Sequence, residues 1–248
     1  MPDRPPLRHA AFVMDTVSHI QHGLWRHPDA QQHRFDELDL WVDLARTLER
    51  GGFDAMFFAD VVGLYGPAGG DYAVNAREGL QVPNGDPSVL ISALAAATDH
   101  LGFAFTSSVL QAHPFEFARR VSTLDHLTKG RVGWNVVTSA LDGAARNFGS
   151  DRLEEHDERY VWAQEYVDVV TKLWEGSWDD DAWRADKAAG VVSDASGIHR
   201  IDHVGENFSV AGPHLSEPSP QRTPTLILAT ASPAGALRAG RIGAGFDV

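Results

Sequence analysis

The sequence has 248 residues, of which 43% are hydrophobic, so the chain is long enough to bury a sizeable core. Its net charge of −13 disfavours nucleic acid or an anionic membrane surface as the main partner, and the absence of cysteine excludes disulfides and thiolate metal sites. The sequence contains no apolar run of about 18 residues, and residues 1–10 lack the apolar core of a signal peptide. We therefore expect a cytoplasmic protein that does not span a membrane.

Strands and helices are predicted to alternate along the chain. Apolar runs predict buried strands at 10–17, 53–59, 101–110, 131–138 and 225–230. Apolar residues at helical spacing, with Gly or Pro near the ends, predict helices at 36–50, 87–100, 115–129 and 154–174, and one that begins at Pro233. Residues 245–248 are typical of the start of a sixth strand. This alternation predicts an α/β fold with right-handed βαβ units and a parallel sheet.

The number of predicted strands indicates a barrel that is not closed. A (β/α)8 barrel has eight strands, whereas this sequence predicts strands one to five and a stub of strand six. We expect one incomplete barrel domain over residues 1–248, with insertions at about 61–86 and 176–209. Such a sheet would have an open edge at strand five or at the stub, with Leu226 and Leu228 poorly covered on at least one side.

Polar residues gather at the C-terminal ends of the predicted strands. Asp60 follows the second strand, Thr106 lies in the second half of the third, Asn135 and Thr138 lie in the fourth, and Ser232 follows the fifth. Because the carboxyl ends of parallel barrel strands meet at one mouth, we expect these side chains to share a site. The alternative is that the Ser and Thr residues cap the helices that follow.

Two further features are consistent with a phosphate site. Ser232 comes just before a helix that starts with Pro233, where free N–H groups and the helix dipole favour an anion. His156 and Tyr160 are four residues apart in a predicted helix and therefore lie on one face. The alternatives are an ordinary N-cap for Ser232 and a partly exposed helix start for His156 and Tyr160. If both groups bind one phosphate, the hydroxyls of Ser232 and Tyr160 lie within about 10 Å of each other.

The sequence does not indicate a metal centre. His199 and His203 have HxxxH spacing, but their segment is not predicted to be helical and no third ligand is evident. The GxGxxG, P-loop, GxSxG and HExxH motifs are also absent. These observations disfavour a metal-dependent barrel hydrolase, the reading that the twelve histidines would otherwise suggest.

Eight segments together carry a family resemblance. They are HIQHGLWRHP (19–28), GGFDAMFFAD (51–60), TSSV (106–109), HPFEFARRVSTLDHLTKGRVGWNVVTS (113–139), NFG (147–149), HDERY (156–160), RIDHVGENFSVAGP (200–213) and ASPAG (231–235). In this order they resemble the bacterial luciferase-like flavin monooxygenases, in particular the branch of nitrilotriacetate, dibenzothiophene-sulfone and long-chain alkane monooxygenases. Members of that family extend beyond the point where this sequence stops, so the resemblance implies a C-terminally truncated barrel.

The resemblance implies a (β/α)8 barrel that uses reduced FMN from a separate NAD(P)H:flavin reductase, together with O2, to oxygenate a small organic substrate. A complete member is expected to be a homo-oligomer. The implied cofactor-binding residues are Asp60, Thr106, Asn135, His156, Tyr160 and Ser232. The first three of these would lie near the flavin ring, and the last three near its phosphate.

The resemblance leaves the catalytic residues and the activity open. His19, His22 and Trp25 follow the first strand and are candidates for the substrate side of the site. The alternative to an active enzyme is a truncated flavin-binding barrel remnant without catalysis.

Overall fold

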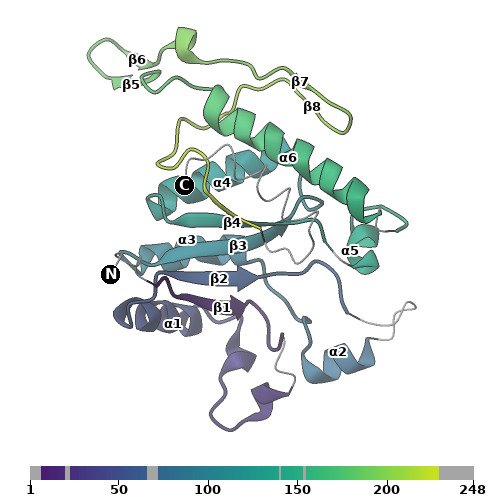
Figure 1. Ribbon diagram of the computed structural model, residues 1–248. Helices are drawn as coiled ribbons and strands as arrows, with labels where there is room; N and C mark the ends of the chain where they lie inside the picture. Colours follow the sequence, from purple (N-terminus) through teal and green to yellow (C-terminus); the bar gives the residue numbers. More distant parts are fainter. Residues whose placement is uncertain (1–6, 20–22, 66–71, 140, 153–154, 229–248) are drawn as a thin grey trace, which may run out of the picture.

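The structure, a computed structural model, describes residues 7–19, 23–65, 72–139, 141–152 and 155–228. Its centre is a parallel sheet with the strand order β1-β2-β3-β4-β9 (Figure 1). The strands are β1 Ala10–Met14, β2 Ala55–Ala59, β3 Gly102–Ser108, β4 Val132–Val137 and β9 Thr225–Ile227. Over the described residues this sheet is open, with β1 and β9 at its edges. The predicted α/β class and parallel sheet are therefore confirmed.

Four long helices cover the sheet and build the core with it. They are α1 Leu38–Arg50, α3 Pro87–Ala96, α4 Pro114–Thr128 and α6 His156–Gly176. Helix α3 begins where its sequence predicts: Pro87 occupies the first turn, and the carboxylate of Asp86 accepts a hydrogen bond from the backbone N–H of Ser88. At the other end of the next helix, Lys129 and Gly130 have positive φ angles of 56° and 80° and close α4 before β4.

Alternation of side chains along the strands decides which residues can form a site. Phe105 of β3 and Trp134 of β4 point toward α4, where the ring centroid of Phe117 lies 6.3 Å and 4.5 Å from theirs. Successive residues of a strand point to opposite faces. The next residues, Thr106 and Asn135, therefore lie on the face of the sheet that is turned away from these helices. On the helix side, Trp134 and Phe117 are both buried.

Several predicted boundaries and two predicted loops differ from the structure. The strand predicted at 225–230 ends at Ile227 within the described residues, where Leu226 and Leu228 are partly buried against the core. The segment 61–86, predicted only as an insertion, contains α2 Ala73–Glu78, and α5 Asp142–Asn147 was not predicted. Both helices have six residues, too few for a clear apolar period. The predicted helix at Pro233 and the strand stub at 245–248 lie outside the described residues.

An insertion was predicted at about 176–209, and the segment between α6 and β9 contains two short hairpins there. One pairs β5 Trp183–Asp186 with β6 Val191–Ser193, and the other pairs β7 His203–Val204 with β8 Ser209–Val210. Three 3₁₀ helices complete the described elements, at Leu24–Arg26, Gln32–Arg34 and Ala195–Gly197. The hairpin strands have two to four residues, too short for a period-2 pattern to be recognised.

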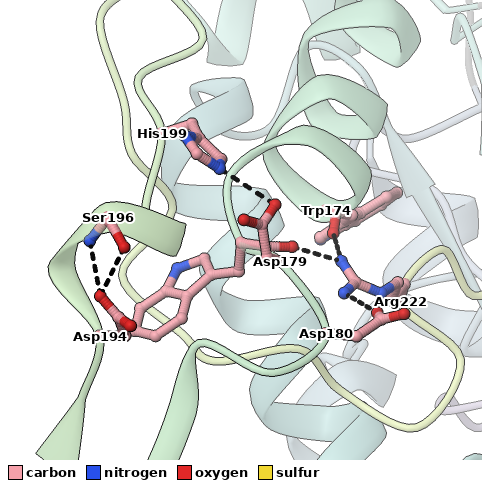
Figure 2. A network of polar contacts seen from close by, with 8 residues as sticks. Trp174, Asp179, Asp180, Asp194, Ser196, His199 and Arg222 are labelled. Carbon is pink, nitrogen blue, oxygen red and sulfur yellow. Dashed lines mark hydrogen bonds and ion pairs between the residues drawn. The ribbon is translucent and has the colours of Figure 1, made fainter.

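Arg222 fixes this insertion to the end of α6 (Figure 2). Its guanidinium donates to the carbonyl oxygens of Trp174 at 3.3 Å and Trp178 at 3.1 Å, and it also pairs with Asp180. Nearby, a ring nitrogen of His199 lies 3.0 Å from a carboxylate oxygen of Asp179 (Figure 2). Arg222 comes just before β9, so these contacts hold the chain where it enters the sheet.

Candidate flavin site

A cavity of about 260 Å³ lies at the C-terminal ends of β2, β3 and β4. Its walls combine residues that are far apart in the sequence, and the first turns of α6 contribute one of them. The polar lining residues are Asp60, Thr106, Ser108, Gln111, Thr138, Ser139 and Tyr160. The structure therefore brings together side chains from three of the strand ends that the sequence analysis singled out. We call this the first cavity.

Thr106 and Asn135 are register partners in the β3–β4 pair. Thr106 lines the first cavity, whereas Asn135 lies beside Thr106 and is not among the described lining residues. The side-chain amide of Asn135 donates to the hydroxyl of Thr106 at 2.8 Å, and each residue is only 5% exposed. The Oδ1 atom of Asn135 is buried and has no hydrogen-bond partner among the described residues. Buried polar atoms in native proteins are nearly always paired, so this oxygen indicates a ligand or water that donates to it.

Asp60 forms the edge of the first cavity directly after β2. Its Oδ1 accepts from the backbone N–H of Val61 at 2.8 Å and from the side-chain amide of Asn84 at 2.9 Å. Burial raises the pKa of Asp60 from 3.8 to about 6, although these hydrogen bonds act in the opposite direction. Near pH 6 this carboxyl group is therefore close to its midpoint between the protonated and ionised forms.

Asp15 is a second carboxyl group at a strand end, and it was not among the residues predicted for the site. It follows β1 as Asp60 follows β2, and burial, together with the charges of Asp86 and Asp36, raises its pKa from 3.8 to about 6. The backbone of Gly85 packs against it so closely that a Cβ atom there would lie 2.0 Å from Asp15 Oδ2. The rule that selected Asp60, a polar residue at the end of a buried strand, would also have found Asp15.

Tyr160 lines the first cavity from helix α6 and is partly buried. Its neighbour Arg159 donates from Nη1 to the backbone carbonyl of Ser139, which also lines this cavity and has a positive φ of 62°. The side chain of His156 and the whole of Ser232 lie outside what the structure describes. The expected closeness of Ser232 and Tyr160 therefore stays a prediction.

The family model for luciferase-like monooxygenases matches residues 14–247. The chain belongs to this family. The match spans β2, β3, β4 and β9 and only the last residue of β1, so the polar residues at the first cavity lie within the matched part of the chain.

Curated relatives and one solved structure agree with this membership. The chain is 53% identical to a long-chain alkane monooxygenase of Geobacillus thermodenitrificans (91% of this chain, 51% of the relative) and 52% identical to a dimethyl-sulfide monooxygenase of Hyphomicrobium sulfonivorans (91% and 47%). It is 39% identical to nitrilotriacetate monooxygenase component A of Aminobacter aminovorans (88% and 49%). A crystal structure of riboflavin lyase with modified FMN and riboflavin superposes with a TM-score of 0.89 at 40% identity, covering 96% of this chain and 52% of that one. The chain thus spans about half the length of these luciferase-like relatives.

Two of the candidates for the substrate side, His19 and Trp25, are not part of the first cavity's lining as the described residues form it. His19 stacks on Phe12 of β1 with ring centroids 5.6 Å apart. Trp25 lies in the 3₁₀ helix Leu24–Arg26, where the Arg26 guanidinium is 5.9 Å from the centroid of its ring. His22 lies outside the described residues. A role for these three residues stays a prediction.

The HxxxH histidines bind different partners. His199 contacts Asp179, whereas His203 lies 3.2 Å from Glu165 and 3.1 Å from Lys172. In the part of the chain that the structure describes, no group of three or more His, Asp or Glu side chains is arranged to hold a metal ion. Among the same residues, no helix combines the length and the apolar character needed to cross a bilayer.

Proposed function

We propose that the first cavity binds FMN and that the protein is a flavin-dependent monooxygenase that oxygenates a small organic substrate with O2. The observation that carries this proposal is the buried, unpartnered Oδ1 of Asn135 beside Thr106. The edge of a flavin ring offers an N–H donor that suits this acceptor. Reduced FMN, when bound, would supply the electrons that activate O2.

The surrounding residues suit the same ligand. Thr106 and Asn135 would hold the polar edge of the ring, and Asp60, with its pKa near 6, would offer or accept a proton there. Tyr160, His156 and Ser232 would hold the phosphate. A volume of about 260 Å³ is slightly below the ~300–1,000 Å³ of typical ligand pockets. We therefore assign to the described residues a part of the flavin site rather than all of it.

The relatives support a two-component system. One of them is named component A of a nitrilotriacetate monooxygenase, which indicates a separate partner for that protein, and the riboflavin lyase structure contains a modified FMN. By analogy we propose that an NAD(P)H:flavin reductase supplies reduced FMN to this protein. The relatives act on substrates as different as long-chain alkanes and dimethyl sulfide, so we propose no substrate more specific than a small organic molecule.

The second candidate function is flavin binding without oxygenation. It is favoured by one observation, namely that the chain spans about half the length of its relatives. A coupled assay separates the two functions. The chain is mixed with NADH, FMN, a flavin reductase and O2, and both product and hydrogen peroxide are measured for an alkane, a thioether and an aminopolycarboxylate.

An oxygenated product above the level made by the reductase alone would support the monooxygenase. Saturable FMN binding with hydrogen peroxide as the sole oxygen product, for every substrate, would instead support the second function. Failure to bind FMN would contradict both. The variant Asn135→Leu serves as the control, because it removes the acceptor that we assign to the flavin.

A further inference from the structure

A second cavity, of about 600 Å³, lies next to the first. It is lined by α5, the first turns of α6, the loop after β3 and the turn between β7 and β8. Thr138 lines both cavities, so the end of β4 forms a common wall. The volume falls within the ~300–1,000 Å³ of small-molecule sites. Of the residues that we assign to FMN, the described ones, Asp60, Thr106, Asn135 and Tyr160, do not line this second cavity.

Much of the second cavity's wall is apolar. Val109 is buried, and Phe148, Val161 and Trp162 present further hydrocarbon and aromatic surface. The indole N–H of Trp162 is directed to the backbone carbonyl of Val109 at 3.4 Å. An apolar molecule, or an apolar part of one, can therefore displace water from this wall favourably.

Arg159 is the charged group that distinguishes the second cavity. Its Nη1 donates to the Ser139 carbonyl, whereas its Nε is buried and has no hydrogen-bond partner among the described residues. A buried guanidinium N–H without an acceptor is unfavourable, because the group has lost water without replacing it. The Nε side of a guanidinium is one of the edges at which a carboxylate binds with two parallel hydrogen bonds. This edge therefore favours an oxyanion.

The other charges of the second cavity lie on its rim. Arg152, Glu158 and Glu206 are exposed, and no ion pair joins any of them to Arg159 in the described part of the chain. Exposed charges are screened by water and contribute little to binding. The half-buried Arg159 is therefore the charge that would select a ligand.

We propose that the second cavity binds an organic anion, with its apolar body against Val109, Phe148 and Trp162 and its carboxylate or sulfonate on the Nε edge of Arg159. This site is separate from the flavin site and does not depend on the proposed activity. It would give the protein a place for a second small molecule beside the cofactor, with Thr138 between the two.

Calorimetric titration of the 248-residue chain with octanoate tests the proposal, with octane-1-sulfonate and 1-octanol as companions. The two anions should bind saturably and at least ~10-fold more tightly than the alcohol, as expected for a charged hydrogen-bonded pair. Arg159→Met should lower the affinity for octanoate by ~10-fold or more, whereas Arg152→Gln should lower it by less than ~3-fold. Equal binding of octanoate and 1-octanol, or unchanged binding by Arg159→Met, would overturn the proposal.

A second variant avoids the contact between Arg159 and Ser139. Val161 is 47% exposed and lines the second cavity, so Val161→Glu places a repelling charge there without disturbing the core. The Val161→Glu variant should bind octanoate more weakly and bind FMN with unchanged affinity. The matched control is Val89→Glu, because Val89 is 72% exposed on α3 and does not line this cavity. Equal effects of the two variants on octanoate, or competition between octanoate and FMN, would contradict a separate anion site.

Discussion

The side-chain amide of Asn135 donates a hydrogen bond to the hydroxyl of Thr106 across the β3–β4 pair, at 2.8 Å. Both residues are buried at the C-terminal ends of adjacent parallel strands. The contact fixes the orientation of the amide and leaves its Oδ1 to accept from another group. We therefore expect Thr106 to act on the proposed flavin in two ways, as a lining residue of the first cavity and through the orientation that it gives Asn135.

Thr106→Val tests this dependence. The variant keeps the shape of the side chain but leaves the Asn135 amide without its acceptor, which costs about 1–3 kcal/mol for a buried group. We expect a lower free energy of unfolding in urea and weaker FMN binding. Thr123→Val is the matched control, because Thr123 is exposed on α4 and its hydroxyl donates to the carbonyl of Arg119 in its own helix. If the two variants behave alike in both measurements, the Thr106–Asn135 contact has no special role.

Asp60→Asn should stabilise the protein at high pH. Burial raises the folded-state pKa of Asp60 to about 6, above its ordinary 3.8. The carboxyl group therefore favours folding below pH 3.8, and this contribution is lost as the pH rises through 6, where the buried group must ionise. Asparagine avoids that ionisation and can still accept from Asn84. Urea unfolding should show a gain of up to roughly 2–3 kcal/mol near pH 8, which shrinks toward pH 4. A gain that grows as the pH falls would contradict this pKa.

Arg131→Met should reduce stability and leave FMN binding unchanged. The Arg131 guanidinium donates to the carbonyl oxygens of Ala95, Leu101 and Thr128, each at 2.8 Å, at the N-terminal ends of β3 and β4. Loss of these bonds should lower the free energy of unfolding by about 3 kcal/mol. Arg119→Met, on the exposed face of α4, should change it by less than ~0.5 kcal/mol. Weaker FMN binding by folded Arg131→Met would show that the two ends of the sheet are not independent.

His214→Gln should reduce the loss in free energy of unfolding that occurs as the pH falls. His214 is 3% exposed, its Nε2 lies 2.9 Å from the Ser122 hydroxyl, and burial lowers its pKa from 6.5 to about 4. Because the pKa of His214 is lower in the folded state, the neutral side chain stabilises the fold above pH 6.5. This stabilisation is lost as the pH falls through 4. The native chain should therefore lose up to roughly 3 kcal/mol more than the variant between pH 7 and pH 4. Parallel profiles for the two proteins would contradict a neutral, buried His214.

The residues that the sequence predicted at the first cavity follow from one rule about parallel strands. Asp60, Thr106 and Asn135 each lie at the C-terminal end of a recognisable apolar run, so their convergence depends only on strand order. Asp15 obeys the same rule, but the first strand was predicted to extend to residue 17, whereas β1 ends at Met14, directly before Asp15. The main helices were predictable for a similar reason, since their apolar period and their Gly or Pro boundaries are local features of the sequence.

The roles of other residues depend on contacts that no local pattern encodes. Arg159 matters because its guanidinium reaches the carbonyl of Ser139, a residue held at positive φ. Arg222 holds the entry to β9 through carbonyl oxygens at the end of α6, more than forty positions away. Short elements such as α5 are set by packing against their neighbours rather than by a period. These contacts and short elements could therefore be identified only from the three-dimensional structure.

The most direct test of the account is a fluorescence titration of FMN into the chain and two variants. We predict saturable binding by the native chain, affinity at least ~10-fold lower for Asn135→Leu, and unchanged affinity for Arg131→Met, measured below the melting temperature of each protein. Arg131→Met controls for lost stability, because its side chain lies at the opposite end of the sheet. Equal FMN affinity for the native chain and Asn135→Leu would contradict the assignment of the first cavity to the flavin.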